Sequence, residues 1–184
     1  SNGQKLTNFN GIIYASVFDK QDTVSTLSND PTSPVRNFTL QKNILYKGKA
    51  TVSNGDFTFT FIVPKDISYK IGNGRLSYYA HNGNEDANGY LDSLLIGGSS
   101  SNPITDNVGP SVKLYLNDEK FVFGGTTDEN PKIYALVTDT NGINTVGNGI
   151  GHDLTATIDD NTDEIYNLND YYEANLDSYQ AGRV

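Results

Sequence analysis

Two histidines are the side chains of this sequence best suited to general acid–base chemistry. His81 follows an alternating apolar segment, and His152 precedes Asp153 in the glycine-rich run 148–153. A histidine beside an aspartate is a typical general base, but hydrolysis by acyl transfer also needs a nucleophile. The sequence has no cysteine, and no serine lies in a Gly-x-Ser-x-Gly motif. We therefore predict no catalytic residue, and we interpret His152 as a side chain that shapes a glycine-rich loop.

The glycine-rich run 148–153 also does not fit a phosphate loop. It lacks the following Lys-Ser/Thr pair, and the sequence predicts no crossover helix behind it. Nucleotide binding is therefore excluded at this run, and no cofactor other than a calcium ion is considered for the chain.

The densest acidic cluster suggests where a calcium ion could bind. Asp159, Asn161 and Asp163 stand at alternate positions, as in the first half of a helix–loop–helix calcium loop, but Glu164 occupies the sixth position, where that loop needs glycine. Loop carboxylates of β-domains can also bind calcium, and Asp139 lies in a second polar turn. The competing interpretation is a pair of solvated hairpin turns.

Tyrosines in neighbouring positions form the remaining candidate binding group. Sugar rings and peptides stack on exposed aromatic faces, so these side chains could form a platform. The competing interpretation is that one tyrosine of each pair is buried and the other exposed. The candidates are Tyr78, Tyr79, Tyr90, Tyr171 and Tyr172.

Composition and charge narrow the classes of protein. The chain has 184 residues, 36% of them hydrophobic, and contains no cysteine. It also contains no methionine, so we expect it to be part of a longer protein, and we interpret residues 1–3 as left from tag cleavage. Residues 1–105 carry 9 basic and 8 acidic side chains, and residues 106–184 carry 4 and 14. The acidic second half argues against nucleic acid as a partner. No apolar run approaches the roughly 18 residues of a spanning helix.

Period-two alternation predicts an all-β fold with two immunoglobulin-like antiparallel β-sandwich units. The clearest hairpin joins 49–52 to 57–63 through Asn54-Gly55, a pair that suits tight turns. The other predicted strands span 12–18, 37–46, 76–80, 90–96, 112–116, 133–137 and 154–158, and 166–174 is predicted to be a turn or short helical piece.

A Gly/Ser-rich stretch containing Pro103 divides these strands into two groups. It coincides with the change in charge, so we predict a sandwich over 4–100, a linker over 101–109 and a partial sandwich over 110–184. In the second unit we expect Val112, Leu114 and Leu116 to point inward. This unit has few strands for a sandwich, so we expect it to be truncated, with an open sheet edge.

Several longer motifs resemble one family. Segment 55–67, which reads GDFTFTFIVPKDI, and segment 72–80, GNGRLSYYA, are similar to the type IX secretion sortases, which are gingipain-type cysteine peptidases. The more specific second-half motifs are 106–117 (DNVGPSVKLYLN), 142–153 (GINTVGNGIGHD) and 169–180 (NDYYEANLDSYQ). The resemblance covers roughly residues 10–184.

The resemblance implies that this chain lies downstream of a peptidase domain in an outer-membrane-associated protein of the bacterial cell surface. That peptidase, with a Cys/His dyad, would remove carboxy-terminal sorting domains from secreted cargo. No dyad residue carries over, because the chain has no cysteine and His152 lies in another module.

These implications lead to a predicted role for the fragment. We expect a non-catalytic accessory or scaffold region that presents loops or an edge to the peptidase domain, to cargo or to other secretion components. The alternative is a carbohydrate-binding or adhesion module of a bacterial surface protein.

Overall fold

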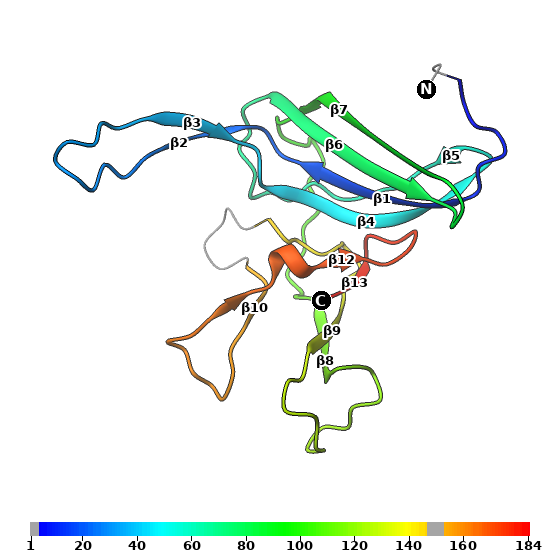
Figure 1. Cartoon of the computed structure of the whole chain (residues 1–184), viewed down its shortest axis with the longest axis vertical. Coiled ribbons are helices and arrows are strands. Elements are labelled where there is room, and N and C mark those ends of the chain that lie inside the picture. Colours follow the sequence, from blue (N-terminus) through cyan, green and yellow to red (C-terminus); the bar gives the residue numbers. More distant parts are fainter. Residues whose placement is uncertain (1–3, 147–152) are drawn as a thin grey trace.

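A computed structural model describes residues 4–146 and 153–184 and confirms the all-β fold (Figure 1). The main sheet is antiparallel and has the strand order β5-β4-β1-β6-β7. Its strands are β1 (Gly11–Phe18), β4 (Ile44–Ser53), β5 (Asp56–Phe57), β6 (Gly72–His81) and β7 (Asp86–Ile96). The hairpin turn between β4 and β5 is the predicted Asn54-Gly55 turn, and both residues have positive φ.

A smaller sheet lies beside the main one, with the strand order β12-β13-β9-β8. Its strands are β8 (Ser111–Leu116), β9 (Ile133–Thr138), β12 (Glu173–Ala174) and β13 (Ala181–Arg183). Two hairpins stand outside both sheets: β2 (Asp22–Ser25) with β3 (Asn37–Leu40), and β10 (Thr155–Ala156) with β11 (Tyr166–Asn167). A 3-10 turn, η1 (Asn169–Tyr171), follows β11.

One hydrophobic core joins the two sheets. Along β1, Ile13, Ala15 and Val17 are buried at alternate positions, which is the period-two pattern of a strand with one covered face. The side chains of Ala15 and Val17 share a cluster with residues of the second half of the chain. The buried members from that half are Val137, Val146, Tyr172 and Ala174.

Tyr46 of β4 is a central side chain of this cluster. It is 7% exposed, and its ring stacks on Phe59 and on Phe61, with ring centroids 5.4 and 5.2 Å apart. Burial and the nearby Asp177 carboxylate raise the pKa of its hydroxyl above the usual value, so it stays neutral at physiological pH. The ring therefore packs as an apolar group in the core between the two sheets.

The free edge of β4 is held by residues 173–177, and we call this contact the seam. The Asp177 carboxylate accepts hydrogen bonds from the Thr51 backbone N–H (2.7 Å) and from the Thr51 hydroxyl (2.6 Å). The Asp177 N–H donates to the Lys49 carbonyl (2.9 Å), and Lys49 pairs with Glu173 (2.6 Å). The seam thus continues the main sheet with a segment from the far end of the chain.

The seam leads to a prediction about acid stability. Hydrogen bonds from the Thr51 side chain and backbone hold the pKa of Asp177 below the ordinary value of 3.8. Because the pKa of Asp177 is lower in the folded state than in the unfolded state, the ionised carboxylate stabilises the fold when the pH is above 3.8. This contribution to stability is lost as the pH falls from 3.8 through the lowered folded-state pKa. We expect Asp177→Ala to lower the free energy of unfolding at pH 7 by about 1 kcal/mol. The loss is no larger because the carboxylate is exposed, so that solvent screens its interactions.

Urea unfolding at several pH values checks this expectation. The difference between the wild type and Asp177→Ala should shrink as the pH falls below 3.8. Asp92→Ala, which removes an exposed aspartate from β7, is the control and should leave stability unchanged. A difference for Asp177→Ala that persisted unchanged in acid would contradict the assigned role.

Three strand predictions were wrong in extent. Segment 37–46 is broken by Gln41–Asn43 into β3 and the start of β4, and segment 57–63 contributes only Phe57 to a ladder. The predicted strand 154–158 is reduced to the two residues of β10, and Ile158 is 54% exposed. In 166–174 the predicted turn is η1, with the short strands β11 and β12 on either side.

The predicted inward face of β8 was also wrong. Val112 is 53% exposed and Leu114 is 64% exposed, although their partners on β9, Val137 and Ala135, are buried. β8 is the edge strand of the smaller sheet, and the described residues do not cover this part of its face. The alternating pattern therefore predicted the strand correctly. However, no part of residues 4–146 and 153–184 packs over Val112 and Leu114, as the prediction required.

Candidate functional site

The outer face of the main sheet carries a shallow hollow of about 600 Å³. Its floor consists of three rings that strand register places side by side. Tyr14 of β1 pairs with Tyr79 of β6, and His81 lies two residues further along β6. The Tyr14 and His81 rings stack at 5.7 Å with an interplanar angle of 18°, and the Tyr14 and Tyr79 centroids are 6.4 Å apart.

Polar groups from the β6–β7 turn form the rim of the hollow. Asp86 pairs with His81 in the ladder, and its carboxylate accepts a hydrogen bond from the Tyr79 hydroxyl (3.2 Å). Glu85 and Asn84 complete this side. The Asn82 side-chain oxygen accepts hydrogen bonds from the N–H groups of Asn84 (2.9 Å) and Glu85 (2.8 Å), so the turn is ordered before any ligand arrives.

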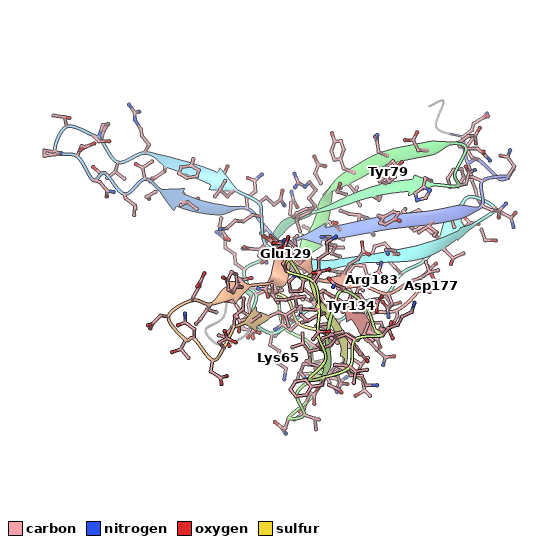
Figure 2. All side chains as sticks on the ribbon, turned by 60° about the horizontal axis from the view of Figure 1, so that its bottom comes forward. Lys65, Tyr79, Glu129, Tyr134, Asp177 and Arg183 are labelled. Carbon is pink, nitrogen blue, oxygen red and sulfur yellow. The ribbon has the colours of Figure 1, made fainter. Side chains whose placement is uncertain are left out.

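The hollow has charged groups of both signs around it, carboxylates at its rim and the Lys49 ammonium near its floor. The Lys49 ammonium lies 5.5 Å from the centre of the Tyr14 ring, on the side away from the acidic rim strand β7. Partial desolvation and the hydrogen bond to the Asp86 carboxylate raise the pKa of Tyr79 above its ordinary value. Figure 2 shows Tyr79 on the main sheet, away from Lys65 and Tyr134 on the other side of the molecule.

The five tyrosines predicted as a platform do not form one group: only Tyr79 lines the hollow, and Tyr90 lies on the same face of the sheet. Tyr172 is 5% exposed and burial raises the pKa of its hydroxyl, whereas its neighbour Tyr171 is 71% exposed. Tyr78 points to the opposite face from Tyr79 and contacts Phe57. The sequence therefore indicated Tyr79 and, for a different role, His81, but not Tyr14, which the β1–β6 register brings beside them.

The proposed calcium ligands lie in two separate turns. Asp159, Asn161 and Asp163 are in the loop between β10 and β11, and Asp139 follows β9. Asp139 accepts a hydrogen bond from the Asn141 N–H (2.7 Å), and Asn161 accepts one from the Asp163 N–H (3.1 Å). Among the described residues, no three acidic, histidine or cysteine side chains gather as metal ligands would. Calcium binding at these residues stays a prediction.

The two histidines are in different situations. His81 belongs to the aromatic floor described above, which is not an arrangement for proton transfer to a nucleophile. His152 and most of the glycine-rich run around it lie outside the described residues.

A second surface feature is the β2–β3 hairpin, which we call the arm (residues 22–40). It projects from one end of the main sheet (Figure 1). All four residues of β3 are exposed. The exposed large apolar side chains on the arm are Leu27 (85% exposed), Val35 (61%), Phe38 (43%) and Leu40 (38%).

Comparison with solved structures shows a similarity to part of a larger protein. No protein-family model and no curated protein match the chain. The structure described as "dimeric latent PorU from Porphyromonas gingivalis" is similar, with 33% sequence identity over 99% of this chain and a TM-score of 0.49. This chain spans 17% of that PorU chain. No helix of the described residues is long and apolar enough to cross a membrane.

Proposed function

We propose that this chain is a non-catalytic accessory module of a larger cell-surface peptidase of the type IX secretion sortase kind, and that it docks onto a protein partner through the arm. The exposed apolar surface of the arm is the observation that carries the proposal. The motifs in 55–80 and 106–180 that resemble those sortases support the choice of parent protein. The partner is the peptidase domain of the same protein or the sorting domain of secreted cargo.

The physical argument starts from the marginal stability of a free hairpin. A two-stranded ribbon alone in water gains too little burial to be stable, and the arm pairs only β2 with β3. Leu27 near its tip and Phe38 in β3 remain exposed. Several exposed apolar side chains on one projecting hairpin are suited to a protein contact, since burying apolar surface on a partner recovers about 25 cal/mol per Å².

The fixed attachment of the arm suits it for docking. The Gln41 side chain, at its base, donates a hydrogen bond to the Asp19 carbonyl (2.8 Å), and Asn43 donates one to Asp22 (2.8 Å). Asp19 is buried and pairs with Lys20 (2.7 Å). These bonds fix the point at which the arm leaves the main sheet, so less conformational freedom is lost when it binds.

A binding experiment on the whole chain tests the proposal. The immobilised chain is exposed to two purified baits, a gingipain-type peptidase domain and a carboxy-terminal sorting domain. We expect one of them to bind at micromolar concentration and the double variant Leu27→Ser/Phe38→Ser to weaken that binding at least about 10-fold, equivalent to 1.4 kcal/mol.

A matched control separates docking through the arm from non-specific binding by any exposed apolar side chain. Leu95 of β7 is 71% exposed and lies outside the arm, so Leu95→Ser should leave binding unchanged. Binding to neither bait, or equal binding by the wild type and the arm variant, would refute the proposal.

A further inference from the structure

We propose that the hollow formed by Tyr14, Tyr79 and His81 is a binding site for a neutral carbohydrate. This inference is independent of docking through the arm. It rests on the combination of a ring-lined floor, an ordered polar rim and a volume of about 600 Å³. That volume falls within the usual range of small-molecule sites, about 300–1,000 Å³.

The Tyr79 ring of the floor suits the apolar face of a sugar ring. One side of a pyranose presents C–H groups, which pack against aromatic faces, while its hydroxyls point outward to polar partners. Tyr79 is 41% exposed, so its ring is accessible to such a ligand. Tyr90 shares this face of the sheet, since it pairs with Ser77, two residues before Tyr79, and it is 69% exposed. The aromatic surface therefore extends past the hollow, as a chain of several sugar units would need.

The rim suits hydroxyl groups. The carboxylates of Asp86 and Glu85 accept hydrogen bonds, and the Asn84 amide both donates and accepts. Because Asn82 already fixes the turn that carries Asn84 and Glu85, a ligand does not have to order it. An ordered rim lowers the entropic cost of binding.

Charge selects a neutral ligand over charged ones. Two carboxylates at the rim repel anions such as phosphates and uronic acids. The Lys49 ammonium, 5.5 Å from the Tyr14 ring centre, places a positive charge beside the floor, which disfavours a cationic ligand there. A ligand with an apolar face and uncharged hydroxyls meets neither repulsion.

Amide NMR titration of the intact chain tests this inference. The probes are the neutral tetrasaccharides maltotetraose, cellotetraose and mannotetraose, with Nα-acetyl-arginine amide as the cationic comparison, each to about 10 mM because single-site sugar binding is often millimolar. We expect saturable shifts for at least one tetrasaccharide, confined to residues 12–16, 77–90 and their ladder neighbours.

Three variants make the test specific. Tyr79→Ala and Asp86→Asn should each weaken tetrasaccharide binding at least 10-fold, whereas Tyr171→Ala, at an exposed tyrosine of η1, should not change it. Amide spectra of the unliganded variants verify that each one is folded. No saturable shift with any tetrasaccharide, shifts located elsewhere, binding unaffected by Tyr79→Ala, or saturable binding of the arginine amide alone would each overturn the inference.

Discussion

Replacing Tyr46 by alanine is expected to lower the free energy of unfolding by about 3–5 kcal/mol, the usual cost of truncating a buried aromatic side chain. The ring is 7% exposed and stacks on both Phe59 and Phe61, so its removal leaves a cavity where the two sheets meet. A loss of this size is a large fraction of the stability of an ordinary domain. Urea denaturation followed by tyrosine fluorescence measures it.

Tyr171→Ala is the matched control for this experiment. Tyr171 is 71% exposed, and its removal should change stability by less than about 0.5 kcal/mol. If Tyr46→Ala were as harmless as Tyr171→Ala, the ring would not lie in a shared core and the packing of the two sheets would be refuted.

Replacing Gly11 by alanine is expected to destabilise the fold by about 1–3 kcal/mol or more, through overpacking against backbone. A Cβ atom at position 11 would lie 2.3 Å from the His81 carbonyl oxygen and 3.0 Å from its carbonyl carbon. Unlike the end of a flexible side chain, a carbonyl in a strand cannot move aside without breaking the β1–β6 ladder. The thermal midpoint should fall by several degrees, which differential scanning fluorimetry detects.

Gly109 provides the comparison for this substitution. Nothing lies within 4 Å of a Cβ built there. Gly109→Ala should therefore be neutral, or slightly stabilising because alanine restricts the unfolded chain. Equal effects of Gly11→Ala and Gly109→Ala would mean that β1 and β6 do not pair in the register described.

Local sequence patterns were sufficient to predict three strands of the main sheet. β1, β6 and β7 contain the predicted segments, because each combines apolar or aromatic side chains with a turn at its end. Gly55 was placed correctly in a turn, and it has positive φ. These features depend on neighbours in the sequence, so the sequence predicts them.

Long-range pairing explains the strand that was overestimated. An extended β5 would need the free edge of β4, but residues 173–177 already hold that edge through Thr51 and Lys49. Phe59 and Phe61 therefore pack onto Tyr46 without joining a ladder. No local pattern around Phe59 indicates that a segment more than a hundred residues later takes its place.

The sequence indicated only some of the residues of the candidate site. Tyr79 and His81 were singled out separately, since each is chemically suited to binding or catalysis. Their partners Tyr14 and Asp86 come from other strands, and the register of β1, β6 and β7 decides which side chains meet. A one-residue shift would turn Tyr14 to the opposite face, so the site follows from pairing and not from composition.

Differential scanning calorimetry of the whole chain tests the central claim most directly, which is that the two sheets share one hydrophobic core and unfold together. We predict a single transition whose calorimetric enthalpy equals the van't Hoff enthalpy, and which Asp177→Ala and Tyr46→Ala each shift as a whole. Two separate transitions, with Tyr46→Ala moving only the one from the main sheet, would contradict the claim.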